Sequence, residues 1–234
     1  ADSGHLPYGL KSDAYIHERM EKITNFLYAR HIDALVIACN TATAVSAEKL
    51  RQQYPNLPII AIEPAIKPAA MATKTGHIAV AATQSTLESA RLQHLIDEYG
   101  QHCVVHKIVG TSWVELVESQ SITPDSNITP LIESLEIFRD YPIDQLILGC
   151  THFPFLDPIL SRILPSNVTV INPANSIVQM CYKRISRVEA HMNTIKDPSV
   201  FVELFTTGDI ESFKAQIALL NLSKTTPSIF KLSI

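Results

Sequence analysis

Short apolar runs alternate with amphipathic stretches along most of the chain, and this alternation constrains the fold more than any other feature. Nearly continuous apolar runs are typical of strands that are buried on both faces of a sheet. Apolar residues at helical spacing between the runs indicate helices that cover those faces. The pattern therefore predicts an α/β fold with mainly parallel sheets. The expected strands are residues 33–38, 57–62, 77–82, 104–109, 145–148, 167–171 and 200–205, and the expected helices are residues 14–30, 43–53, 85–99, 128–139, 155–164 and 174–187.

The alternation is absent from two segments. Residues 124–130 are polar and rich in turn-forming residues, which predicts a surface loop. Residues 223–234 show no convincing pattern of either kind.

Two of the expected strand ends resemble each other. The segment Asp33-Ala-Leu-Val-Ile-Ala-Cys39 matches the segment Asp144-Gln-Leu-Ile-Leu-Gly-Cys150, with Asp six places and Leu four places before each Cys. Ligands of parallel α/β sheets lie outside the carboxyl ends of the strands, where both cysteines fall. The repeat predicts two similar lobes, related by a pseudo-two-fold axis, with the active site in the cleft between them. We expect residues 1–64 with 174–234 to form one lobe and residues 65–173 to form the other.

The two repeated cysteines stand in polar surroundings. Cys39 and Cys150 are each followed by two hydrogen-bonding residues, whereas Cys103 begins an apolar run and Cys181 lies in a helical pattern. A free cysteine is most often a small buried hydrophobe, and this is our interpretation of Cys103 and Cys181. A thiol has an ordinary pKa of about 8.5, so a modest influence makes it an acid or a base near neutrality. Two thiols across a cleft are suited to moving a proton between the two faces of a carbon atom.

The segments Cys39-Asn40-Thr41-Ala42 and Gly149-Cys150-Thr151-His152-Phe153-Pro154 resemble two signature motifs of one known family. This family is the glutamate racemases of the aspartate/glutamate racemase superfamily. The segment Asp2-Ser-Gly-His-Leu-Pro-Tyr8-Gly9, with Lys11-Ser12, is similar to the family's loop before its first long helix. Shorter likenesses occur at residues 62–65, 82–89, 115–118 and 206–209, so that the resemblance extends from residue 1 to about residue 220.

The resemblance implies roles for particular residues. Cys39 and Cys150 would be the alternating proton acceptor and donor, without a cofactor and without a metal. His152 would assist Cys150, because an imidazolium beside a thiol favours the thiolate. Asp2 and Glu118 look like the family's acidic residues around the site. The residues implied to bind the substrate are Tyr8, Gly9, Asn40, Thr41, Thr83, Thr151 and His152.

The chain departs from the family's pattern in two places. The family begins with a further strand and helix, and Asp2-Ser-Gly resembles the motif at the end of that strand only superficially, because Pro7-Tyr8-Gly9 follows too soon. We therefore expect the first strand and helix to be absent, which corresponds to roughly 25–30 residues. In addition, Asn172-Pro173 stands where the family usually has an acidic turn, and nothing in the sequence assigns it a function.

Charge and hydropathy limit the possible partners. The net charge is -4 and the basic residues do not cluster, which argues against nucleic acid. No apolar run approaches the about 20 residues that a membrane helix needs, and the amino end lacks the pattern of a signal peptide. We therefore expect a cytoplasmic protein. The resemblance implies glutamate as the substrate and D-glutamate for peptidoglycan as the product, and it leaves a homodimer open.

Other interpretations compete with a glutamate racemase. A racemase for aspartate or another amino acid of the superfamily differs only in the shape of its pocket. A cysteine hydrolase would use Cys150 and His152 as nucleophile and base, but it would leave Cys39 without a role. A non-catalytic member of the fold is a third interpretation. Among single residues, Asp2 is also compatible with a turn or a cap, and Glu118 with a solvated helix position.

Overall fold

The computed structural model describes residues 1–119, 127–185, 202–219 and 227–234. Within these residues, all strand pairs are parallel, which confirms the predicted α/β fold. The strands form one four-stranded sheet, with the order β4-β3-β5-β6, and the two-stranded sheets β1-β2 and β7-β8. The strands are β1 Leu35–Ile37, β2 Ile59–Ala61, β3 His77–Ala82, β4 Val104–Val109, β5 Gln145–Leu148, β6 Thr169–Ile171, β7 Glu203–Thr206 and β8 Ser228–Lys231.

The helices come between the strands, as the alternation predicts. Two short 3-10 helices, η1 Ser3–His5 and η2 Tyr8–Leu10, come before α1, and a third, η3 Phe153–Leu156, lies between β5 and α9. The α-helices are α1 Asp13–Tyr28, α2 Asn40–Gln53, α3 Ile66–Ala72, α4 Gln84–Glu88, α5 Ala90–Tyr99, α6 Thr111–Glu118, α7 Thr129–Ser134, α8 Ile137–Asp140, α9 Asp157–Ile163, α10 Ala174–Ile185 and α11 Ile210–Leu219.

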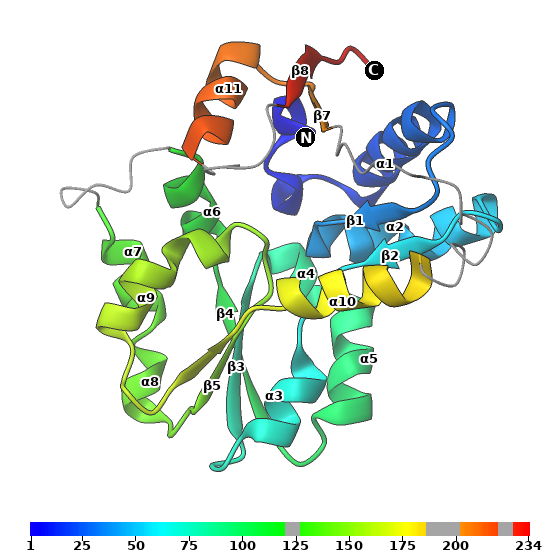
Figure 1. The fold of residues 1–234 in the computed structure, drawn as a ribbon. Coiled ribbons are helices and arrows are strands. Elements are labelled where there is room, and N and C mark those ends of the chain that lie inside the picture. Colours follow the sequence, from blue (N-terminus) through cyan, green and yellow to red (C-terminus); the bar gives the residue numbers. More distant parts are fainter. Residues whose placement is uncertain (120–126, 186–201, 220–226) are drawn as a thin grey trace.

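The four-stranded sheet is buried on both faces. Ala79 and Ala81 of β3 pack with Trp113 and Phe153 in one core cluster, whereas Ile78 and its alternate neighbours pack in another. Figure 1 shows α7, α8 and α9 on one side of this sheet and α3 and α5 on the other. A strand that is apolar at every position is therefore stable here, because alternate side chains enter different cores.

The remaining strands form the other lobe. Its core cluster joins α1 and α2 to the β1-β2 sheet, with Ile16, Leu50 and Ile59 almost fully buried. Figure 1 shows β7, β8 and α11 in the same half of the molecule, close to the chain's first residues. We propose lobes of residues 1–64 with 174–234 and of residues 65–173, because β3 to β6 all lie in the second range.

Several predicted elements differ from the observed ones. The helix predicted at 85–99 is broken at Ser89, whose backbone is extended and whose hydroxyl accepts the Leu92 N–H at 3.1 Å. The helix predicted at 128–139 is likewise divided into two helices, α7 and α8. The first residues of α7 overlap the loop predicted at 124–130, so the loop prediction was partly wrong. The segment 223–234 contains a strand, β8, and α3, α6 and α11 were not predicted. Val36 of β1 is exposed, so β1 is not the buried strand that was expected.

The predicted boundaries are most accurate in the central sheet. The observed β3, β4 and β5 have the predicted limits, although β4 is an edge strand with alternating burial. The predicted strand at 200–205 and the predicted helix at 174–187 extend beyond the described residues, and the first three residues of the predicted loop at 124–130 lie outside them. The described parts of the predicted strand and helix correspond to β7 and α10.

Candidate active site

Cys39 lies between β1 and the amino end of α2. It is the N-cap residue of α2, and its Sγ accepts the Ala42 N–H at 3.5 Å. Free N–H groups and the helix dipole favour negative charge at such a position. Burial acts in the opposite direction and is the larger effect, so the pKa of the Cys39 thiol is raised. The Cys39 thiol is consequently protonated at neutral pH.

Cys150 follows β5 through Gly149. A side chain at Gly149 would come within 2.9 Å of both the Ala81 carbonyl and the Ala82 Cβ, so only glycine fits between β5 and its neighbour β3. The loop then turns directly into η3. This turn brings His152 Nδ1 to 3.6 Å from Cys150 Sγ. The two residues that the sequence places in one loop are therefore in contact.

His152 is held from its other side by Glu118, the last residue of α6. His152 Nε2 lies 2.7 Å from Glu118 Oε1. Burial alone would lower the pKa of His152, but its bonds with Cys150 and Glu118 outweigh burial and raise this pKa to about 9. The same ion pair lowers the pKa of Glu118. At neutral pH the structure therefore holds an imidazolium beside Cys150 and a carboxylate behind the imidazolium.

Cys150 influences Cys39 through its charge. A negative charge on Cys150 raises the pKa of Cys39 further. The lobes also meet nearby in a cluster of buried threonines, in which Thr41 Oγ1 lies 2.9 Å from Thr83 Oγ1 and 3.2 Å from Thr86 Oγ1. Thr41 comes from α2, whereas Thr83 and Thr86 belong to the start of α4. These contacts join the amino end of α2 to the end of β3.

Asn40, which follows Cys39, has a buried side chain without a partner. Only 4% of the residue is exposed, and among the described residues neither its Nδ2 nor its Oδ1 has a hydrogen-bond partner. The Thr43 hydroxyl, on the same first turn of α2, also lacks a partner within this part of the chain. Buried polar groups are nearly always hydrogen-bonded in proteins, so each exception requires an explanation. The buried amide of Asn40 is such an exception.

The loop that contains Tyr8 and Gly9 packs against the same threonines. A side chain at Gly9 would come within 2.9 Å of Thr83 Cβ, so the backbone approaches Thr83 closely. The Tyr8 ring is buried, and its hydroxyl donates to Asp2 Oδ2 at 2.5 Å. Burial and the Asp2 carboxylate both raise the pKa of Tyr8, which keeps the phenol protonated. Gly9 thus lies against Thr83, and Tyr8 is bound to Asp2.

Asp2 has a different environment from the one that its expected catalytic role requires. Arg19 forms a bidentate ion pair with the Asp2 carboxylate, with Nε 3.0 Å from Oδ2 and Nη2 2.7 Å from Oδ1. Tyr8 and Thr207 donate to the same carboxylate. These bonds outweigh burial and lower the pKa of Asp2. The structure also excludes a simple capping role, because Asp2 makes no side-chain cap bond to η1.

The sequence did not indicate three residues that complete these networks. Arg19 lies on the core side of α1 between Ile16 and Met20, and a charged residue in that apolar stripe was the available signal. Gln216 of α11 donates to Glu118 Oε2 at 3.3 Å, and no pattern marks it. Thr86 belongs to a segment that was noted only for its likeness to the family. Thr151, which was expected to bind substrate, is half-buried beside Cys150.

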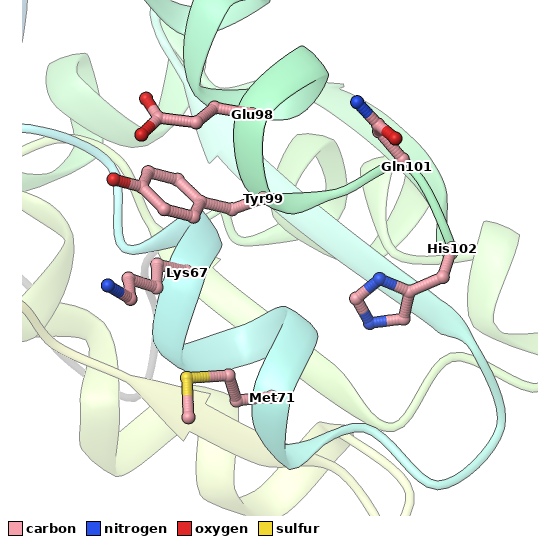
Figure 2. Close-up of a pocket in the computed structure, with 6 residues that line it drawn as sticks. All are labelled: Lys67, Met71, Glu98, Tyr99, Gln101 and His102. Atoms are coloured by element: carbon pink, nitrogen blue, oxygen red, sulfur yellow. The ribbon is translucent and has the colours of Figure 1, made fainter.

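A pocket elsewhere on the surface does not compete with this site. Figure 2 shows it between α3 and α5, where Lys67 and Tyr99 lie together and His102 lies apart from them. The Lys67 ammonium is 4.9 Å from the centre of the Tyr99 ring, and His102 Nε2 is bound to the Ala70 carbonyl. The pocket contains neither Cys39 nor Cys150. Its lining residues are Lys67, Met71, Glu98, Tyr99, Gln101 and His102.

The described residues contain no group of three or more His, Cys, Asp or Glu side chains that is placed to hold a metal ion. None of their helices combines the length and the apolar character that a membrane crossing requires.

The fold is of the α/β class, and two cysteines stand at the ends of its parallel strands. Residues 8–181 match the family model of the Asp/Glu/hydantoin racemases, and the chain belongs to this family. It is accordingly an isomerase of the amino-acid racemase class. The resemblance that the cysteine motifs indicated is thus confirmed.

Individual relatives support the assignment. The glutamate racemase of Ectopseudomonas mendocina is 39% identical over 220 residues, covering 94% of this chain and 82% of that protein. The glutamate racemase of Pseudomonas paraeruginosa is 41% identical, covering 80% of this chain and 70% of that protein. The crystal structure of the Escherichia coli glutamate racemase, in complex with L-glutamate and the activator UDP-MurNAc-Ala, has a TM-score of 0.83 and 28% identity, covering 99% of this chain and 86% of that one. The two-lobe fold is shared with this structure.

Proposed function

We propose that this protein interconverts L-glutamate and D-glutamate by proton transfer between Cys39, the substrate's α-carbon and Cys150. The observation that carries the proposal is the interaction of two thiols from different lobes beside the unpartnered amide of Asn40. Relatives that are named glutamate racemases, at about 40% identity, support glutamate as the substrate. Without the second thiol, a single base would tend to return the proton to the face from which it came.

The reaction needs one thiolate and one thiol. One sulfur removes the α-proton, so the C–H bond breaks as an S–H bond forms, and the other thiol delivers its own proton to the opposite face. Burial raises the pKa of the Cys39 thiol, which suits Cys39 to donate a proton. The cationic His152 lies beside Cys150, so Cys150 would remove the proton of one enantiomer and Cys39 would protonate the carbanion. In the reverse direction the two sulfurs exchange these roles.

The substrate's charged groups need hydrogen-bond partners near both sulfurs. The amino end of α2 supplies N–H groups and a favourable dipole for a carboxylate. The Asn40 amide and the hydroxyls of Thr41 and Thr83 supply further groups, and Tyr8, Gly9 and Thr151 lie on the adjoining loops. A carboxylate held in this way stabilises the negative charge that develops at the α-carbon. We assign binding to these residues and to His152, and assistance to Glu118.

Asp2 enters the proposal in a changed role. Its carboxylate already accepts hydrogen bonds from Arg19, Tyr8 and Thr207, so we assign to it the orientation of Tyr8 and not a proton transfer. As for the biological role, D-glutamate made here would be used in peptidoglycan. The cytoplasmic location and a homodimer stay predictions.

One assay tests the proposed reaction. The protein is incubated with L-glutamate in deuterated water without any added cofactor, and the optical rotation and the α-deuterium content are followed. We expect the rotation to decay as deuterium enters the α-position, because the proton delivered to the second face comes from a solvent-exchanged thiol. Racemisation of aspartate but not of glutamate would overturn the substrate assignment. Exchange without loss of rotation would overturn the two-face mechanism.

A further inference from the structure

The Cys150 side of the site includes a contact that crosses between distant parts of the chain. Glu118 uses one carboxylate oxygen, Oε1, for His152 at 2.7 Å, and the other, Oε2, for Gln216 at 3.3 Å. Glu118 ends α6, which follows strand β4 of the four-stranded sheet, whereas Gln216 lies on α11, which follows β7. Figure 1 shows α11 next to the end of α6. The row Cys150, His152, Glu118 and Gln216 is therefore continuous across the two halves of the molecule.

Glu118 requires donors from outside its own helix. As the last residue of α6, its carboxylate stands at the end where the helix dipole is negative, which disfavours an anion. The carboxylate is about one-third exposed and can adopt other rotamers unless both oxygens are held. His152 holds only one of them. The Gln216 amide is the donor that fixes the other oxygen and hence the plane of the carboxylate.

We propose that Gln216 is a positioning residue for the proton transfers of Cys150. Gln216 fixes Glu118, Glu118 fixes the His152 ring, and the ring stays within reach of Cys150. Cys39 accepts its hydrogen bond from the Ala42 N–H, which lies outside this row. The inference rests on the proposed two-thiol function, and it predicts that Gln216 affects one thiol and not the other.

The two thiols can be separated with a substrate that reacts at one of them. Glutamate with chloride on its β-carbon undergoes elimination: a thiolate takes the α-proton and chloride leaves from the β-carbon. The resulting enamine tautomerises and hydrolyses to 2-oxoglutarate and ammonium, so no second proton donor is needed. The Cys39→Ser protein then reports on Cys150, and the Cys150→Ser protein reports on Cys39. Each is offered the enantiomer that it prefers.

The test introduces Gln216→Met into both proteins. Methionine keeps the length and volume of glutamine but donates no hydrogen bond. We expect kcat for elimination through Cys150 to fall about 5- to 10-fold, with little change in KM, which corresponds to about 1–1.4 kcal/mol in the barrier. Elimination through Cys39 should not change. Gln216→Glu should lower the Cys150 rate further, because it places a like charge beside Glu118.

A matched control lies on the same helix. Lys214 is exposed and its amine binds Glu211 on the surface, so Lys214→Ala should change neither elimination rate. If Gln216→Met lowered both rates equally, or neither, the positioning role would be overturned. If both single-cysteine proteins with native Gln216 failed to eliminate chloride, the proposed function itself would be overturned. The two failures are therefore distinguishable.

Discussion

Cys39 and Cys150 follow two similar strand ends, yet their surroundings differ in kind. Cys39 caps a 14-residue helix and has a backbone N–H as its hydrogen-bond donor. Cys150 lies in a turn before a short 3-10 helix and contacts an imidazolium that a carboxylate supports. Burial raises the pKa of Cys39, whereas a cation stands beside Cys150. The two strand ends thus place one sulfur in a buried, uncharged setting and the other beside a cation.

The repeat also differs at its aspartates. Asp144 is buried and accepts hydrogen bonds from the Thr73 hydroxyl and from the N–H groups of Lys74 and Thr75. Asp33, at the equivalent place before Cys39, is exposed. Each repeated strand places a sulfur atom at its end, whereas the residues that follow the strand determine the electrostatic surroundings of that sulfur. Similar sequence at the two ends therefore does not require similar proton affinity.

The first prediction removes the cation from one side only. His152→Gln should lower kcat for racemisation by about 100-fold, because a positioned acid–base partner contributes about 10²- to 10⁴-fold. His94→Gln is a matched control, since His94 is exposed and pairs only with Glu98 on its own helix. Steady-state kinetics in both directions measure the effect. An unchanged rate for His152→Gln would show that Cys150 works without its imidazolium.

The second prediction compares the two aspartates. Asp144→Asn should lower the free energy of unfolding by about 2 kcal/mol, because it weakens three hydrogen bonds to a buried carboxylate. Asp33→Asn should change it by less than about 0.5 kcal/mol, as is usual for exposed positions. Urea denaturation of both variants measures the difference. Equal losses would mean that the two strand ends are more alike than the structure indicates.

The third prediction concerns the reactivity of the free protein. Iodoacetamide at pH 7 should modify Cys150 about 10-fold faster than Cys39, because burial raises the pKa of the Cys39 thiol and the thiolate is the reacting form. Peptide mapping by mass spectrometry separates these two from Cys103 and Cys181. In His152→Gln the two rates should approach each other. Faster modification of Cys39 would contradict the raised pKa of its thiol.

The smallest expected effect is a pH dependence of stability. The pKa of His152 is raised from 6.5 to about 9 in the folded protein, so its contribution is fully present below pH 6.5 and is lost as the pH rises through about 9. The free energy of unfolding should therefore decline between these values. The decline should be weaker in His152→Gln. Denaturation curves at several pH values measure both slopes, and parallel slopes would contradict the assigned pKa.

Local sequence predicted the parts of the molecule that depend on local pattern. The limits of β3, β4 and β5 follow from continuous apolar runs, and the contact of Cys150 with His152 follows from their shared loop. The break at Ser89 was missed because its hydroxyl replaces a helical hydrogen bond without interrupting the apolar spacing. The strand β8 was missed because its four residues show no period on their own.

Long-range partners could not be predicted in the same way. Glu118 lies 34 positions before His152, and Gln216 lies 98 positions after Glu118, so no spacing rule connects them. Asp2 was expected at the site from resemblance, but its carboxylate is bound by Arg19, whose burial depends on the packing of α1. Asn40 was predicted from its motif, while the lack of partners for its amide is visible only in three dimensions.

The most direct test of the central claim is the enantiomer preference of the two single-cysteine proteins. Cys39→Ser and Cys150→Ser are each given both enantiomers of the β-chloro substrate, and chloride release is measured beside racemisation of glutamate. If the two thiols act on opposite faces, as we propose, both variants should lose racemisation, and each should eliminate chloride from the enantiomer that the other rejects. By resemblance to the family, we expect Cys39 to act on the D-isomer and Cys150 on the L-isomer. Preference of both variants for the same enantiomer, or normal racemisation by either, would contradict the two-thiol account.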